Sequence, residues 1–262
     1  AIFQTLLRNP LASPDVMGFS AGSGLAILGA LTVNLTIPMP IVACAGGLLT
    51  AAFVLVVARP AFGQMSLEGA PAVTIVLVGI GVGFTAAAFS SFLMTRLSGP
   101  EAAEAQRWLA GSLAARDWSH VLQLFGMVVV LVALLLIQVR NLRLLELGSE
   151  LATGLGINVR KSRLGLSATA VLLAASAVAI AGPSAFVALM APPLGARIAR
   201  TTDAGGRMLA SALTGALIVV LADLASRATL PGLQLPIGVM TGILGAPYLL
   251  WLLSREIERG EL

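Results

Sequence analysis

The sequence is poor in the residues that metal sites and covalent enzymes need. Its 262 residues include one cysteine, Cys44, one histidine, His120, and one lysine, Lys161. A disulfide within the chain, a cysteine or histidine metal cluster, an HExxH zinc motif and a Ser-His-Asp triad therefore find no support. The phosphate-binding pattern GxxxxGK[ST] is absent as well, so any ATP hydrolysis must be the work of another chain. We expect no catalytic residue, no metal ligand and no cofactor in this chain.

Charged residues are also scarce. They make up 11% of the sequence, against 58% hydrophobic residues and a mean hydropathy of +0.97, whereas a soluble domain has about 25% charged residues. Lipid must therefore be the solvent for much of the chain. The apolar runs are continuous rather than alternating, which favours helices over a β-barrel. The sequence predicts an all-α, polytopic membrane helical bundle, with residues 1–262 forming one domain.

Eight apolar runs approach the roughly 20 residues with which a helix crosses the hydrocarbon core. One of them is short and contains Pro192 and Pro193, so we expect a broken crossing there. The first residues, 1–7, are apolar but too few to span, and we expect the sequence to begin inside a helix. The predicted spans are residues 16–36, 41–58, 71–97, 121–139, 164–181, 184–196, 208–225 and 237–254.

The positions of the cations agree with this arrangement of spans. They gather at the ends of apolar runs, which indicates membrane topology rather than a nucleic-acid partner. Of the 16 lysine and arginine residues, only Arg96, Arg107, Arg116 and Arg227 fall on the outer side, which leaves twelve inside. The positive-inside rule then places the C-terminus in the cytoplasm.

A polar stretch at residues 140–164 separates two of the spans and carries five cations. Leucines recur in it at helical spacing, acids lie near its start and glycines near its end, a pattern that predicts a short amphipathic helix. One interpretation is an ordinary loop, and the other is a docking helix for a cytoplasmic partner, with Ala152 against that partner. The candidate docking residues are Leu147, Gly148, Glu150, Ala152, Leu155 and Gly156.

Two further groups could carry function. Gly79, Gly81 and Gly83 lie in the predicted span at residues 71–97, where no dinucleotide site fits, so they serve close helix packing or line a pathway. Asp223 lies one helical turn before Arg227. An ionisable residue within a span is a functional candidate, and the alternative is a structural pair near the outer interface.

Five segments, in this order along the chain, resemble the permease subunits of iron-siderophore and vitamin B12 ABC importers. They cover essentially the whole chain. Within that family, three pieces look most like a ferric enterobactin (catecholate) permease: AIFQTLLRNPLASPDVMGF, the span that contains GIGVG, and RLLELGSELATGLGINVRKSRL. The segments are FQTLLRNPLASPDVMG, LELGSELATGLGINVRKSRL, AGPSAFVALMAPPLGAR, LADLASR and LQLPIGVMTGILGAPYLLWLL.

The resemblance implies a ten-helix type II importer fold in the bacterial inner membrane, with the first helix and part of the second lacking here. It implies a second permease subunit, identical or paralogous, two cytoplasmic ATPase subunits, a periplasmic binding protein and a ferric siderophore as cargo. The family's coupling region matches residues 144–163. Arg227 matches an arginine that receives the binding protein, and the span with Gly79 and Gly83 matches a helix that lines the path.

One departure from the family concerns the short span. The family usually has Pro-His where this chain has Pro192-Pro193, so the role of that histidine does not transfer. Two other classes stay open from the residues themselves: an ion-coupled secondary transporter that uses Asp223, and a structural membrane subunit without a pathway. An ATPase that docks on residues 148–159 distinguishes the importer from both.

Overall fold

The computed structural model describes residues 1–9, 12–57, 70–113, 116–184, 186–201, 203–228 and 235–259. This part of the chain is helical and contains no strand, which confirms the predicted all-α class. The predicted loop at residues 61–69 and most of the predicted outer loop at residues 229–236 lie outside the described residues.

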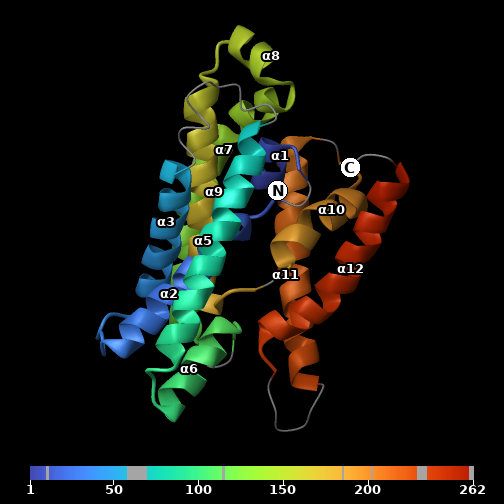
Figure 1. The fold of residues 1–262 in the computed structure, drawn as a ribbon. Helices are drawn as coiled ribbons and strands as arrows, with labels where there is room; N and C mark the ends of the chain where they lie inside the picture. The colour runs from blue at the N-terminus through green and yellow to red at the C-terminus, as the bar shows by residue number, and fades with distance from the viewer. Residues whose placement is uncertain are drawn as a thin grey trace.

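The long helices run roughly along the bundle, whereas the short helix α8 is turned away from that direction (Figure 1). Their bounds are α1 Ile2–Leu7, η1 Pro14–Met17, α2 Phe19–Thr32, α3 Met39–Val57, α5 Ala70–Met94, α6 Gly99–Leu109, α7 Trp118–Glu146, α8 Ser149–Gly154, α9 Val159–Ala181, α10 Val187–Ala199, α11 Ala204–Ala228 and α12 Ile237–Arg259.

Each predicted span corresponds to an apolar helix. Five helices are long and apolar enough to cross a membrane: α3, α7, α9, α11 and residues 76–94 of α5. Three apolar helices are shorter, namely α2, α10 and residues 237–251 of α12. Together they account for the eight predicted spans, and the short helix α6 lies between α5 and α7 in the chain.

Side-chain caps explain where three of the helices begin. Ser98 and Glu101 form a capping box at the start of α6. The Asp117 carboxylate accepts the backbone N–H groups of the first turn of α7, and Asn158 caps α9 in the same way. The His120 ring lies 2.7 Å from the Asp117 carboxylate, so the single histidine belongs to a helix cap.

The helices form two groups. One contains α2, α3, α5, α7 and α9, and the other contains α10, α11 and α12 (Figure 1). Small residues allow close packing within each group. A Cβ added to Gly22 on α2 would lie 1.9 Å from Thr50 Oγ1 on α3, and one added to Gly195 on α10 would lie 2.7 Å from backbone atoms of Ala210 on α11.

A junction near α6 joins the two groups through the backbone; we call it the α6 junction. It consists of Ala110–Ser112, the end of α9 and the start of α12. The Ile237 and Gly238 N–H groups donate to the Gly111 and Ala110 carbonyls at 3.1 Å, and the Ser112 N–H donates to the Ala181 carbonyl at 2.9 Å. Gly111 has a φ of +73° and leaves no room for a Cβ, which would lie 2.4 Å from the Pro183 carbonyl.

The predicted broken crossing is α10 together with the chain that precedes it. A helix of 13 residues is about 20 Å long, too short to span alone. The chain leaves the α6 junction at Pro183 and first reaches Phe186, which packs against Gly245 on α12. Because Gly245 lies eight residues into α12, Phe186 is about 12 Å from the start of that helix. The helix α10 therefore begins about 12 Å inward from the end of the bundle at which α12 starts.

Candidate functional site

The α8 helix and its flanking residues lie at the opposite end of the bundle from α6 (Figure 1). Gly148, with a φ of +108°, precedes α8, and Gly156, with a φ of +85°, follows it. Other residues rarely adopt these backbone angles, so glycines set both limits of the helix. The Gly156 N–H donates to the Thr153 carbonyl at 2.9 Å. The predicted glycine stop is confirmed, in a helix shorter than residues 148–159.

Three leucines at four-residue spacing face outward here, and we call them the leucine stripe. Leu147, Leu151 and Leu155 are 56%, 61% and 55% exposed. Ala152 is fully buried and packs in the core cluster that contains Leu142. The expectation that Ala152 faces a partner is therefore wrong, because the next residue after Leu151 on a helix turns about 100° away and points into the bundle.

A polar contact joins α8 to α9: the Arg163 guanidinium donates to Ser149 Oγ at 3.0 Å. Exposed charged residues surround the leucine stripe, among them Glu150 and Arg160. The result is an apolar stripe with a charged rim, the arrangement typical of a protein-binding surface.

Two ion pairs connect the end of α7 to the start of α11. Arg143 Nη2 lies 2.9 Å from Asp203 Oδ2, and Arg207 pairs with Glu146. The Gly206 N–H and then the Arg143 guanidinium hold the pKa of Asp203 below its ordinary value. These four residues were not among the predicted site residues.

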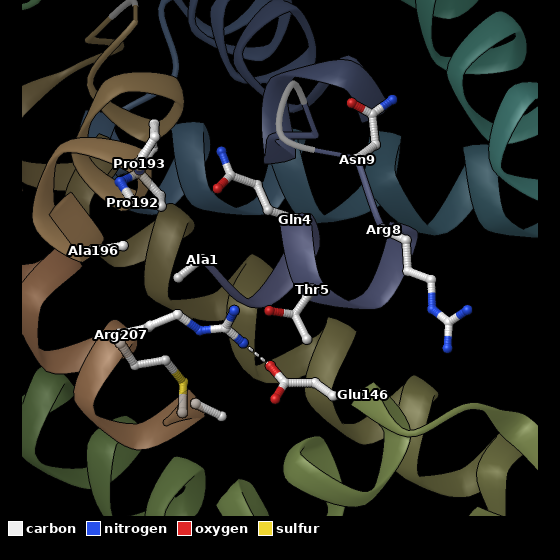
Figure 2. A pocket seen from close by; sticks show the side chains of 12 residues that line it. Ala1, Gln4, Thr5, Arg8, Asn9, Glu146, Pro192, Pro193, Ala196 and Arg207 are labelled. Carbon is white, nitrogen blue, oxygen red and sulfur yellow. Dashed lines mark hydrogen bonds and ion pairs between the residues drawn. The ribbon is translucent and has the colours of Figure 1, made fainter. Parts of the chain in front are cut away.

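A pocket of about 490 Å³ lies beside these ion pairs, between α1, α7, α10 and α11. Figure 2 shows the paired Glu146 and Arg207 side chains across from Pro192 and Pro193. Arg8 adds a second cation to the lining. Pro193, at the position where the family usually has histidine, therefore gives this pocket an apolar wall where an imidazole would offer a hydrogen-bonding group.

The glycines of α5 are divided between two faces. Gly79 is buried, and a Cβ added to Gly18 would lie 3.2 Å from its carbonyl oxygen. A Cβ on Gly83 would touch the Gly18 Cα at 3.9 Å, whereas Gly81 has no neighbour within 4 Å of its added Cβ. The structure thus favours close packing for Gly79 and Gly83, and the open face of α5 carries Gly81 and Thr85.

The predicted pair at the other end of the bundle is present. Arg227 Nε donates to Asp223 Oδ2 at 2.9 Å, and Arg227 Nη2 lies 3.4 Å from Oδ1. The Arg227 side chain is 52% exposed and that of Asp223 is 23% exposed. Asp223 therefore orients a guanidinium whose remaining donors face outward.

The sequence matches the FecCD transport family over residues 1–255. The chain belongs to the FecCD transport family. This confirms the resemblance that the five segments indicated, and FecCD membership applies to the whole bundle rather than to one of its helix groups.

Two relatives with import permease names are each 38% identical to this chain over the aligned residues. The Fe(3+)-citrate import system permease protein YfmE of Bacillus subtilis (strain 168) is 38% identical over 263 residues, 99% of this chain and 76% of the relative. The ferric enterobactin transport system permease protein FepG of Escherichia coli (strain K12) is 38% identical over 262 residues, with the same shares covered.

A solved structure supports the FecCD fold. It is described as an inward-facing conformation of a metal-chelate type ABC transporter and superposes with a TM-score of 0.83, covering 97% of this chain and 79% of its own. Its sequence identity is 23%, so the likeness bears on the fold alone.

Proposed function

We propose that this chain is the permease subunit of an ABC importer that moves a ferric siderophore of the catecholate type across the bacterial inner membrane. The observation that carries the proposal is the leucine stripe on α8, at one end of a bundle that belongs to the FecCD family. An exposed apolar stripe beyond the ends of membrane helices needs a protein partner. The partner we propose is a cytoplasmic ATPase, one for each of two permease subunits.

The mechanism we propose is alternating access. ATP binding closes the two ATPases, which push on α8 through Leu147, Leu151 and Leu155. Since only Leu147 and Gly148 separate α8 from α7, and Arg163 on α9 donates to Ser149 on α8, the push tilts these spans and changes which end of the path is open. No covalent chemistry takes place in this chain, and the C-terminus lies in the cytoplasm with α8.

Purification in mild detergent tests the ATPase proposal. We expect a nucleotide-binding subunit to travel with the wild-type permease at a ratio of one ATPase to one permease. A permease that purifies without any nucleotide-binding subunit, and that still transports, would remove the importer proposal in favour of a secondary transporter.

The cargo proposal is supported by the relatives. One carries ferric citrate by name and another ferric enterobactin, and the segments of this chain look most like the enterobactin permeases. Uptake of the same iron isotope, presented as ferric enterobactin, ferric citrate or a ferric hydroxamate, tests it directly. We expect enterobactin to give the fastest uptake. Faster uptake from citrate would overturn the catecholate assignment and leave the importer intact.

The open face of α5 is the part of this chain that we propose lines the path. Gly81→Phe places a ring in open space, so we expect normal amounts of protein in the membrane and a loss of uptake of about tenfold or more. Gly83→Phe drives the same ring against Gly18, so we expect little folded protein. The two variants differ only in face, and normal uptake by the Gly81 variant would exclude this face from the path.

We propose that Arg227 receives an acidic residue of a periplasmic binding protein, with Asp223 holding it in place. Arg227→Glu is expected to weaken capture by about tenfold, mostly through a slower association rate that depends on salt. Arg107→Glu makes the same charge change at the same end of the bundle and is the matched control. Equal effects of the two variants would mean that general charge, rather than Arg227, governs capture.

The ion-coupled alternative gives Asp223 a different task. In a secondary transporter Asp223 would bind and release a proton or sodium ion during transport. Proteoliposomes that hold the permease, the ATPase and the binding protein, with the ion gradients collapsed, separate the two readings. We expect uptake driven by ATP to persist, and its loss at full ATP would favour the ion-coupled transporter.

A further inference from the structure

The two helix groups are held together differently at their two ends. At the α6 junction the connection consists of backbone hydrogen bonds among Ala110–Ser112, Ala181 and Gly238, which cannot change without unfolding the helix ends. Near α8, the polar contacts between α7 and α11 are the ion pairs Arg143–Asp203 and Glu146–Arg207. A body with a rigid backbone connection at one end and side-chain contacts at the other is built to open at the second end.

The geometry of the ion pairs suits a contact that forms and breaks. Arg143 and Glu146 lie one turn apart on α7, and Asp203 and Arg207 lie one turn apart at the start of α11, so both pairs form together when the two helix ends meet. Their side chains are between 26% and 53% exposed. Pairs with this exposure shift an equilibrium by about severalfold rather than by orders of magnitude.

The pairs also lie where a push on α8 would arrive. Glu146 is the last residue of α7 and adjoins Leu147, the first residue of the leucine stripe. The pocket that opens beside Arg207 is lined by α1, α7, α10 and α11, and thus by both sides of the contact. A displacement of α8 must therefore move Glu146 relative to α11, or carry α11 with it.

We propose that Arg143, Glu146, Asp203 and Arg207 form a latch that transmits the displacement of α8 to α10, α11 and α12 and sets the opening of the pocket between the helix groups. The four are positioning residues, since they act through the helices that they join. The source of the displacement rests on the proposed function, because the ATPase supplies it. The ability of the latch to open is argued from the ion pairs alone.

Charge exchange in the complete transporter tests the latch. Glu146→Arg and Arg207→Glu each place like charges together, so we expect uptake per ATP hydrolysed to fall by about fivefold or more. The double exchange restores an attractive pair and is expected to return coupling to within about threefold of wild type. Arg96→Glu changes an exposed cation near the opposite end of the bundle, makes the same charge change as Arg207→Glu and should leave coupling unchanged.

A double variant with two neutral side chains tests the latch even if the charge-exchange variants fail to fold. Glu146→Gln with Arg207→Gln removes the attraction without adding repulsion, and we expect it to lower uptake per ATP while the protein remains folded. Lack of rescue in the double exchange, with both single variants folded, would overturn the latch. So would full coupling in the neutral pair.

A distance measurement on the permease alone separates failure of the latch from failure of the proposed function. Spin labels replace Arg160 and Ile198, one on each helix group, in a Cys44→Ser background. We expect the distance to broaden in Arg207→Glu, to recover in the double exchange and to broaden in wild type as salt rises from about 0.1 to 1 M, because screening shortens the Debye length from about 10 to 3 Å. No response to charge or salt would overturn the latch. A clear response, combined with a purification that recovers no ATPase, would leave the latch intact and overturn only the importer.

Discussion

Leu151→Glu with Leu155→Glu is expected to separate the permease from its ATPase and to abolish ATP-driven uptake. Burial of one leucine side chain is worth about 1.5–3 kcal/mol. Loss of two, with two carboxylates facing an apolar groove, weakens association by more than about 100-fold. Both leucines are more than half exposed, so the free permease should fold and reach the membrane normally. The ATPase recovered per permease in mild detergent, together with uptake, measures the effect.

Thr153→Glu is the matched control for the leucine variants. Thr153 is exposed on the same short helix but lies off the leucine stripe, and its hydroxyl only donates back to the Ser149 carbonyl at 2.8 Å. Thr153→Glu adds the same charge as Leu151→Glu alone, which is the variant to compare it with, and we expect ATPase recovery within about threefold of wild type. Equal loss in the control would mean that any acid on α8 prevents docking, and the leucine stripe would lose its special role. A bulky Ala152 variant does not serve here, because Ala152 packs in the core with Leu142.

Gly22→Leu is expected to prevent the bundle from folding, while Gly29→Leu on the same helix is tolerated. At Gly22 the first added carbon already meets Thr50 Oγ1 at 1.9 Å and the Gly46 carbonyl at 3.0 Å, and Thr50 is held there by its own bond to that carbonyl. Overpacking against backbone costs more than about 3 kcal/mol. At Gly29 nothing lies within 4 Å, and leucine is the better helix former by about 0.8 kcal/mol.

The amount of folded, monodisperse protein extracted in mild detergent distinguishes the two glycine variants, and a thermal unfolding midpoint quantifies the second. Normal yield of Gly22→Leu would mean that α2 and α3 do not approach as closely as described here. A strong loss in Gly29→Leu would point to a partner on the outer face of α2.

Hydropathy and glycine placement were enough to predict much of the fold. The apolar runs predicted the eight apolar helices, five of which are long enough to cross a membrane, because lipid demands continuous apolar helices whatever their neighbours are. Gly148 and Gly156 limited α8 because the requirement for a positive φ is local to each residue. The pair of Asp223 and Arg227 was predictable for the same reason, since both side chains belong to one turn of one helix.

The features that were wrong or missed depend on which helices become neighbours. Ala152 lies on the same predicted helix as the leucines of the stripe. Only the position of the core shows that its side chain points inward while theirs point outward. Gly79 and Gly83 read equally well as a path lining until Gly18 is placed against them. The partners in the pair Glu146–Arg207 are 61 residues apart. Each has an opposite charge one turn away in its own segment, Arg143 for Glu146 and Asp203 for Arg207, so local spacing favours pairs within a helix rather than this pair between helices.

The chain between Pro183 and Phe186 has a consequence for where water reaches. Residues 182–184 and Phe186 are not helical, and Phe186, with a φ of +66°, lies beside Gly245, well below the start of α12. Backbone groups without helical partners are not tolerated against lipid tails, and at such a depth they are found only where protein or solvent surrounds them. This stretch therefore marks a side of the bundle from which hydrocarbon is excluded, with protein or water around the backbone at the level of Phe186.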